Sequence, residues 1–252
     1  MMNTSVFSCA MLAVNAKPWR PGWTRALVPL AAAAALVAAS IGNAAAAPAT
    51  GDTYVYRIVN AYNSEPRGKI QYRVDRIDAD RIALAVTTDT PSAGRARTEV
   101  YTREGNWLRH PLINHDQPVE YDFTPAYPAY DFPLESGKSW SVRVHAVDPA
   151  SGRRNSVRVD AEVLGSERIS TPAGTFDTIK IKRKIYAGDW EFFRRETNIT
   201  EIDWYAPALG RAVRSESNSA YLDPTRCGRM RCDPIRGDWN VFELVEVTTA
   251  KP

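Results

Sequence analysis

The stretch TPAGTFDTIKIKRK, residues 171–184, joins a turn signal to a strand whose polarity alternates. Proline in the second position and glycine in the fourth are preferences of a type I turn. The strand that follows points Ile179, Ile181 and Ile185 to one side, and Lys180, Lys182 and Lys184 to the other. Three lysines on one face are a candidate surface for an anionic partner, but such a row is typical of the solvated face of a sheet. We therefore interpret this stretch as scaffold.

The same period of two recurs along the chain. Residues that this period places together on one face are Tyr54, Tyr56 and Ile58; Ile70, Tyr72 and Val74; Ile82, Leu84 and Val86; Trp140, Val142, Val144 and Ala146; and Val157, Val159, Ala161 and Val163. This pattern indicates antiparallel strands with one face in the core and the other in water. The sequence predicts an all-β, mainly antiparallel domain, in which a curved meander sheet forms a half-barrel, a barrel or a sandwich with little helix.

The amino-terminal segment has the pattern of a secretory signal. Residues 1–25 contain Lys17, Arg20 and Arg25 but no acidic residue, and an apolar run ending in small residues follows. Its strongly apolar part, residues 26–41, is shorter than the roughly 20 residues that span a bilayer, which favours a signal peptide over an uncleaved anchor. We predict a signal peptide over residues 1–46, cleaved at Ala45 or Ala46, and a periplasmic or secreted bacterial protein with no transmembrane anchor.

Cleavage would change the charge balance of the protein. The full chain has 32 Lys and Arg against 29 Asp and Glu, and residues 1–46 hold three of the basic residues, so 29 of each sign remain. A balanced chain gives no electrostatic reason to expect a nucleic-acid partner. Residues 47–252 are long enough for a single β-rich domain with a sizeable core.

Two cysteines, Cys227 and Cys232, remain after cleavage, because Cys9 lies in the signal segment. In an exported protein such a pair is most simply a disulfide. Redox-active pairs usually have two residues between the cysteines in an α/β context, and a zinc site would need two further ligands nearby. We predict a structural disulfide that clips a long loop over residues 219–238.

Three segments carry a resemblance to known proteins: FPLESGKSW (132–140), TPAGTFDTIKI (171–181) and WYAPALGRAVRSE (204–216). In this order they resemble a group of exported bacterial β-rich domains of unknown function, with a PAGTF-type turn before one strand and a WYAP-x-LG segment ending another. Those domains are similar to the half-barrels of lipoprotein-carrier proteins, so the resemblance implies a curved, half-open antiparallel sheet more than an activity. Pro207 and Gly210 fit a reversal between two strands, which needs no catalytic explanation.

Two candidate catalytic patterns fail on inspection. SGKS (136–139) would complete a phosphate-binding loop only with a glycine at position 132, where Phe132 stands, and with a helix after it. His110, His115 and Asp116 have a spacing that suits a metal on one helical face, but Pro111 predicts a polar surface loop instead.

Glu201 and Asp203 share a strand face by their i, i+2 spacing, which places two carboxylates together as a glycosidase needs. Paired acids on a solvent-facing strand are much commoner, and we expect that arrangement here. The sequence therefore predicts no catalytic residue, no metal site and no cofactor.

The segment PVEYDFTPAYPAYDFPL, residues 118–134, is the best candidate for contact with a ligand. Its aromatic residues are Tyr121, Phe123, Tyr127, Tyr130 and Phe132. Its prolines exclude a helix and stiffen the chain, so the rings should lie on a semi-rigid strap. They either cover one open end of the sheet as a satellite core, the commoner arrangement, or form a lid over an apolar cavity.

Two function classes remain open. The first is a non-enzymatic envelope protein that binds an apolar or amphiphilic, lipid-like small molecule in the concave face of its sheet. The second is a structural or interaction module whose edges and disulfide loop dock another envelope protein, and a hydrolase is a distant third. Unfilled volume beside the aromatic strap would favour the first class, whereas a packed interior with an exposed apolar patch would favour the second.

Overall fold

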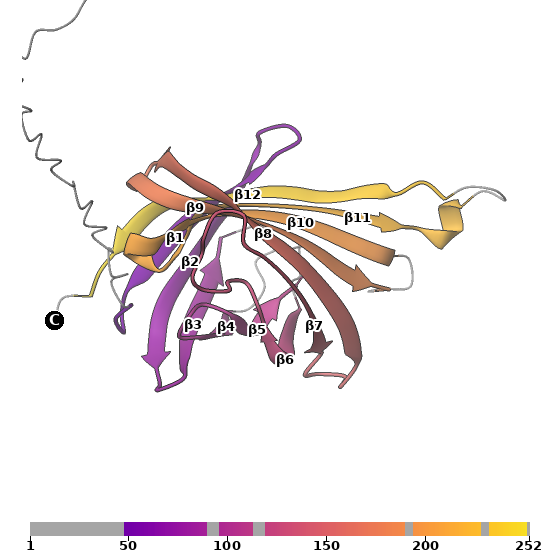
Figure 1. Cartoon of the computed structure of the whole chain (residues 1–252), viewed down its shortest axis with the longest axis horizontal. Helices are drawn as coiled ribbons and strands as arrows, with labels where there is room; N and C mark the ends of the chain where they lie inside the picture. The colour runs from indigo at the N-terminus through magenta and orange to yellow at the C-terminus, as the bar shows by residue number, and fades with distance from the viewer. Residues whose placement is uncertain (1–47, 90–95, 113–118, 190–193, 228–231, 251–252) are drawn as a thin grey trace, which may run out of the picture. The chain divides into compact units, whose positions relative to one another are not determined.

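The computed structural model describes residues 48–89, 96–112, 119–189, 194–227 and 232–250. Within these ranges the chain forms twelve antiparallel strands that close into one barrel (Figure 1). Each strand pairs with its neighbour in the sequence, and the last strand pairs back with the first. The signal peptide predicted over residues 1–46 lies outside the described residues. No helix in the described ranges has the length and apolar character needed to cross a membrane.

The elements are β1 (Thr53–Asn60), β2 (Pro66–Ile77), β3 (Arg81–Thr88), β4 (Arg97–Thr102), β5 (Trp107–Pro111), β6 (Glu120–Tyr127), β7 (Ser139–Val147), β8 (Arg154–Thr171), β9 (Gly174–Gly188), β10 (Arg195–Ala206), η1 (Pro207–Leu209), β11 (Arg211–Leu222), η2 (Pro224–Arg226) and β12 (Ile235–Thr248).

The prediction of an all-β antiparallel meander is confirmed, and of the three closures left open the barrel is the one that forms. The half-open sheet that the resemblance implied is not formed, because β1 pairs with β12 along its whole length, from Thr53 opposite Thr248 to Asn60 opposite Asn240. Pairing the first strand with the last satisfies the backbone groups that an open edge would expose.

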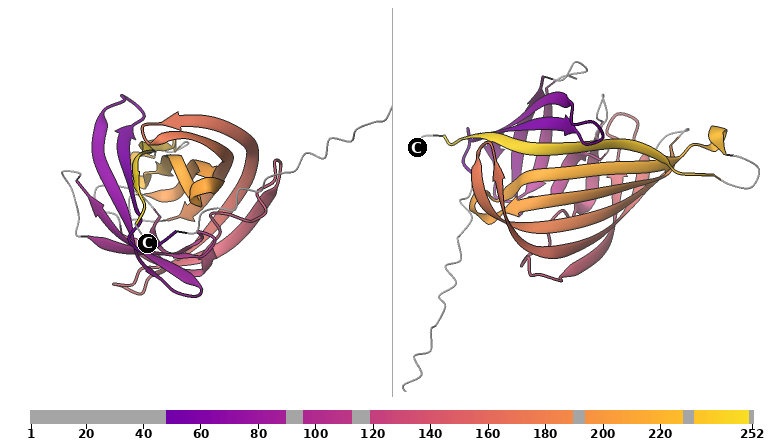
Figure 2. Two further views of the ribbon diagram at one scale, coloured as in Figure 1. Left: turned by 90° about the vertical axis from the view of Figure 1, so that its left-hand side faces the viewer. Right: turned by 90° about the horizontal axis from the view of Figure 1, so that it is seen from above.

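The turn and the strand predicted over residues 171–184 are present, but the inward face of the strand carries the buried Arg183 between Ile181 and Ile185. Thr171 ends β8 and pairs with Gly174 at the start of β9, so the turn joins two strands directly. Ile181 and Ile185 are fully buried, whereas Lys182 and Lys184 are exposed. The tip of this hairpin curls toward β12, where the Ala173 backbone N–H donates to the Leu244 carbonyl at 3.4 Å (Figure 2, right).

The reversal predicted around Pro207 and Gly210 is also present. The chain leaves β10 after Ala206, makes the single turn of η1, and enters β11 at Arg211. Gly210 adopts a left-handed conformation, with φ of 63°, which a glycine accepts without steric cost. This turn matters because it sets the position of Arg211 at one end of the barrel.

The alternating strands place both described ends of the chain, near Pro48 and Ala250, at the same end of the barrel. The connections β4–β5, β6–β7 and β10–β11 lie at this end too, and Figure 2 (left) looks onto it. We call this end the mouth and define it by Gly105, Phe132 and Gly210. The connection between β11 and β12 lies at the opposite end.

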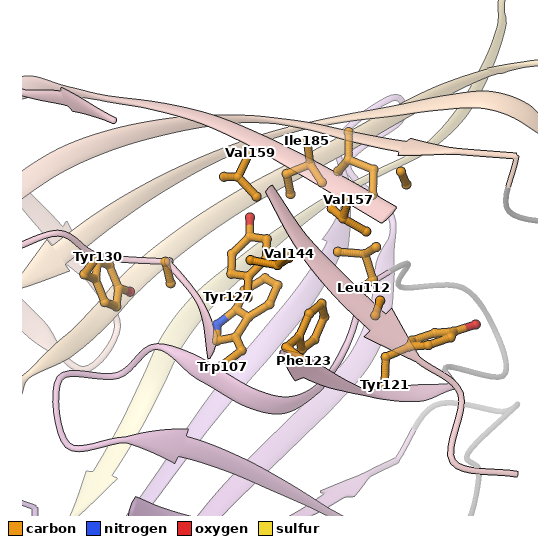
Figure 3. Close-up of a cluster of buried hydrophobic side chains, with 14 of the residues drawn as sticks. Trp107, Leu112, Tyr121, Phe123, Tyr127, Tyr130, Val144, Val157, Val159 and Ile185 are labelled. Atoms are coloured by element: carbon orange, nitrogen blue, oxygen red, sulfur yellow. The ribbon is translucent and has the colours of Figure 1, made fainter. Parts of the chain in front are cut away.

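The buried side chains form two clusters that divide the interior. One cluster belongs to β5–β10 and is densely packed around Trp107, Tyr127 and the buried valines of β7 and β8 (Figure 3). The other belongs mainly to β1–β3 and β10–β12 and includes Tyr54, Tyr56 and Leu84. The inward faces predicted for the first strands are confirmed, but their side chains surround space rather than fill it.

The long loop predicted over residues 219–238 is shorter than expected. β11 runs to Leu222 and β12 begins at Ile235, and the two strands remain paired as far as Tyr221 opposite Ile235. The pairing of β12 with β11 continues beyond Asn240, where its pairing with β1 ends, and Figure 1 shows these two strands reaching out at one end of the barrel. The predicted disulfide is present in the remaining connection and joins Cys227 to Cys232, whose Cα atoms are 4.4 Å apart.

The double substitution Cys227→Ser, Cys232→Ser should lower the free energy of unfolding by about 2 kcal/mol, the loop-closure entropy expected of so short a loop. The connection lies at the end of the barrel opposite the mouth, so the interior should keep its structure. Urea unfolding of the double variant beside the wild type measures the effect. Two thiols that alkylate in the unreduced wild-type protein would contradict the predicted disulfide.

Candidate functional site

The barrel encloses a cavity of about 460 Å³ that reaches the mouth. Its volume lies within the range of about 300–1,000 Å³ that is common for small-molecule sites. Most of its wall comes from inward-facing side chains of the first strands and of β10–β12.

Aromatic and aliphatic side chains make up much of the cavity wall. They include Tyr54 and Tyr56 of β1, Tyr72 and Val74 of β2, Ile82 and Leu84 of β3, Tyr101 of β4, Tyr205 of β10 and Phe242 of β12. The strand period of two places these residues on the inner face of the closed sheet. A wall of this kind favours an apolar part of a ligand.

A buried ion cluster forms the floor of the cavity. The Arg183 side chain is 2% exposed. Its Nη2 donates to Glu201 Oε2 at 3.0 Å and to Asp203 Oδ2 at 2.7 Å, and its Nη1 donates to the Ala129 carbonyl at 3.1 Å. The cluster follows from register, because Arg183 of β9 lies directly opposite Glu201 of β10.

Burial and charge act against each other within this cluster. Burial alone would lower the pKa of Arg183, but the carboxylates of Asp203 and Glu201 outweigh it and hold that pKa well above the usual value. Burial raises the pKa of Glu201, and the Arg183 guanidinium opposes that rise. The arginine therefore stays charged and compensates acids that would otherwise be very costly in a protein interior.

The expectation that Glu201 and Asp203 face solvent is wrong, because both side chains are buried. The inward face of β10 also carries Ile199 and Tyr205, so the strand period places the two acids inside the barrel. Both carboxylates accept hydrogen bonds from the same guanidinium. The structure thus explains the pair as a counterion set for Arg183.

Asp203 links the ion cluster to the cavity wall. Its Oδ2 also accepts from the Tyr130 hydroxyl at 3.3 Å, and its Oδ1 accepts from the Ser215 hydroxyl at 2.5 Å. Tyr130, Ser215 and Arg183 all line the cavity. The floor therefore presents polar groups whose positions are fixed by several hydrogen bonds.

Arg211 occupies the wall of the cavity near the mouth. Its guanidinium lies over the Tyr54 ring, with Cζ 4.0 Å from the ring centroid, and within 5.3 Å of the Tyr56 and Tyr72 centroids. Its Nε donates to the Tyr56 hydroxyl at 2.8 Å. Burial opposes the charge of Arg211, but the surrounding tyrosines outweigh it, and the pKa of Arg211 is raised.

His110 lies in a strand and not in the predicted surface loop, because β5 continues to Pro111 and turns this side chain inward. Its ring stacks on Trp107 at a centroid distance of 3.9 Å, and Nε2 lies 3.4 Å from Glu99 Oε2. His115 and Asp116 lie outside the described residues. Within the described ranges, the structure contains no group of three or more His, Cys, Asp or Glu side chains that could hold a metal ion.

Stability should fall as the pH drops below about 6.5, the ordinary value for histidine. Burial lowers the pKa of His110 in the folded protein, and the Glu99 carboxylate opposes this. The unfolded chain therefore takes up a proton at higher pH than the folded one, and the contribution of neutral His110 is lost progressively as pH falls toward its folded pKa.

Urea unfolding of the wild type and of His110→Gln, at several values between about pH 7 and pH 5, checks this dependence. Because glutamine does not titrate, the wild type should lose stability relative to the variant as the solution becomes acidic. A stability difference that stays constant over this range would contradict the expectation.

The five aromatic residues of the predicted strap divide between the core and the cavity. Residues 120–127 form β6, whose inward face places Tyr121, Phe123 and Tyr127 in the packed cluster (Figure 3). Tyr127 stacks on Trp107 with ring centroids 4.0 Å apart. A proline cannot donate a backbone hydrogen bond to a neighbouring strand. Pro125 does not disturb the pairing of β6 with β7, because that pairing covers only Asp122 to Thr124.

Tyr130 and Phe132 follow the strand and line the cavity. Tyr130 also belongs to the buried cluster drawn in Figure 3, at its border with the cavity. Both rings contact Tyr205, with centroid distances of 4.7 Å for Tyr130 and 5.8 Å for Phe132. Phe132 is 44% exposed and stands at the mouth, so the lid prediction is kept for these two residues alone.

Arg183 and Arg211, which line the cavity, were not among the residues that the sequence predicted. Arg183 interrupts the inward series of Ile181 and Ile185, and this interruption is the signal that would have revealed it. Its pairing with Glu201 depends on a strand register that the sequence does not specify. Arg211 follows the turn at Gly210 and gives no comparable signal.

Comparisons with known proteins agree with this fold. A family model described as DUF3108-like matches residues 135–220, about a third of the chain, which contain most of the segments that carry the resemblance. No curated protein matches the chain.

Among solved structures, the chain is similar to a candidate lipoprotein from Parabacteroides distasonis, with 17% identity and a TM-score of 0.50 over 80% of this chain and 97% of that one. It is also similar to a candidate exported protein with a YmcC-like fold from Bacteroides fragilis (15%, TM-score 0.48, 80% and 97% covered). A third similar structure is the hypothetical lipoprotein YmcC from Escherichia coli (12%, TM-score 0.42, 79% and 85% covered). At these identities the similarity concerns the fold, and part of this chain resembles a family of unknown function.

Proposed function

We propose that the protein is a non-enzymatic binding protein of the bacterial cell envelope that holds one small amphiphilic molecule inside its barrel. The cavity of about 460 Å³ carries this proposal. A barrel that served only as scaffold would fill its interior with side chains, as the half around Trp107 and Tyr127 does. The signal pattern of residues 1–46 supports the envelope location, and the description of a similar solved structure as a candidate lipoprotein agrees with it.

The lining favours an amphiphile over a purely apolar molecule. Tyrosine rings and the aliphatic side chains of Val74 and Leu84 offer apolar contact, whereas Arg183 and Arg211 bring charge to the same space. A few positioned polar groups in a mainly apolar wall are typical of sites that fix the orientation of a ligand.

The distribution of exposed apolar residues supports this class over a docking module. In the described part of the chain the large exposed hydrophobic residues are Tyr62, Val119, Phe132 and Leu164. They lie on four separate segments, and Phe132 belongs to the cavity mouth. Docking surfaces usually present such residues as one contiguous patch.

Titration with the neutral fluorescent dye phenylnaphthylamine tests the proposal. The wild type should bind the dye saturably with one molecule per chain, and Leu84→Trp, which places a large ring in the cavity, should abolish binding. Leu164→Trp is the matched control, because Leu164 is exposed on β8 and does not line the cavity. The absence of saturable binding by the folded wild type, or equal binding by Leu84→Trp, would refute the proposal.

A further inference from the structure

Arg211, which is half-buried, differs from Arg183 and Arg97 in what surrounds its charge. Arg183 has Glu201 and Asp203 as counterions, and Arg97 has Glu99 at 2.9 Å. Within the described ranges, no carboxylate lies at ion-pair distance from the Arg211 guanidinium. A desolvated charge without a counterion is costly, and proteins normally pair it.

The tyrosines around Arg211 stabilise the cation without using most of its hydrogen-bonding capacity. Stacking on Tyr54 engages the face of the guanidinium, and Nε donates to the Tyr56 hydroxyl. That hydroxyl donates in turn to the Ala212 carbonyl at 2.7 Å, which fixes its orientation. A guanidinium has five N–H donors, so its Nη edge remains able to bind a planar, two-oxygen acceptor.

We infer that the cavity accepts an amphiphile with a single carboxylate headgroup, bound at the Nη edge of Arg211, with its apolar tail along Val74, Ile82 and Leu84. This inference rests on the proposed function and names the chemistry of the ligand. Val74, Ile82 and Leu84 line the same cavity as Arg211. Val74 follows Tyr72, which the guanidinium contacts, on the inner face of β2, so headgroup and tail would bind to adjoining parts of one wall.

The charges of the cavity favour a carboxylate over a phosphate monoester. Arg211 contributes one positive charge to the cavity wall, which one carboxylate neutralises, whereas Arg103 and Glu104 of the β4–β5 connection bring one charge of each sign to the mouth. Glu201 and Asp203 line the same cavity, so the second charge of a phosphate would meet repulsion in a medium of low dielectric constant. A carboxylate also matches the guanidinium edge in bidentate geometry.

Displacement of phenylnaphthylamine by dodecanoate and by dodecanol at about pH 7 tests the inference. The two probes share a tail and differ in the headgroup charge. The wild type should bind dodecanoate about ten- to a hundredfold more tightly than dodecanol, since a hydrogen bond to a charged group contributes that much. Arg211→Gln should remove the difference by lowering the affinity for dodecanoate alone. Arg211→Lys should retain part of the difference, because lysine keeps the positive charge but lacks the paired N–H donors of a guanidinium.

Arg214→Gln is the matched control. It makes the same change on the same strand, but Arg214 pairs with Glu216, lies against the Trp204 ring and does not line the cavity. Its affinity for dodecanoate should equal that of the wild type. Equal affinities of the wild type for dodecanoate and dodecanol, or unchanged dodecanoate binding by Arg211→Gln, would overturn the headgroup inference while the proposed function stands. Failure of both probes and of the dye to bind would overturn the proposed function as well.

Discussion

Substitution of Arg183 by methionine should lower the free energy of unfolding by about 3–5 kcal/mol. The change leaves the methylene stem approximately in place but removes the guanidinium that donates to Glu201 and Asp203. Both carboxylates would then be buried without a counterion. They would have to take up protons or rely on water from the cavity for their hydrogen bonds, and either costs free energy.

Urea unfolding of Arg183→Met, beside a variant that also carries Glu201→Gln and Asp203→Asn, measures this effect. The triple variant should recover much of the loss, because the amides carry no charge. Lys182→Met, next in sequence and on the outer face of β9, should change stability by less than about 0.5 kcal/mol. A triple variant less stable than Arg183→Met would contradict a cost that comes from unpaired charge.

Tyr127→Ala should also destabilise the barrel by about 3–5 kcal/mol, the usual cost of truncating a fully buried ring. The Tyr127 side chain is 0% exposed and stacks on Trp107 at the centre of the packed cluster. The deletion would leave a hole that the rigid strands around it cannot close. Thermal and urea unfolding of the variant measure the loss.

Phe132→Ala gives the contrasting result that separates lid from core. Its ring is 44% exposed at the mouth, so its removal should cost less than about 1.5 kcal/mol, while the affinity for phenylnaphthylamine should fall. If Tyr127 and Phe132 belonged to one strap with a single role, Tyr127→Ala and Phe132→Ala would change stability and dye binding alike. A large loss of stability in Phe132→Ala with unchanged dye binding would exclude a lid role for this residue.

Much of the fold could be predicted because strand alternation leaves a clear trace in the sequence. The inward sets on β1, β2 and β3 could be predicted residue by residue, since polar side chains separate Tyr56 from Ile58 and Ile70 from Tyr72. Closure could not be predicted, because it depends on pairing between β1 and β12 across the whole chain. The pairing of β11 with β12 near their connection could not be predicted either, so the connection was expected to be longer than it is.

The candidate site was harder to predict, because its polar residues occupy inward-facing strand positions, where the alternating pattern predicts apolar residues. Glu201 and Asp203 look like solvent-facing acids until Arg183 is placed opposite them. Arg211 lies at a strand end, where alternation is weakest, and its burial depends on three tyrosines from β1 and β2. In the aromatic segment 118–134, a strand accounts for Tyr121, Phe123 and Tyr127, and only the residues beyond its end reach the cavity.

Native mass spectrometry of the purified protein after incubation with dodecanoate tests most directly whether the barrel interior is a binding cavity. It reports the mass of any ligand and the number of molecules bound to each chain. The wild type and Leu164→Trp should each carry one dodecanoate per chain, and Leu84→Trp should carry none. A bare wild-type chain, or adducts of equal number on the wild type and on folded Leu84→Trp, would contradict a ligand held inside the barrel.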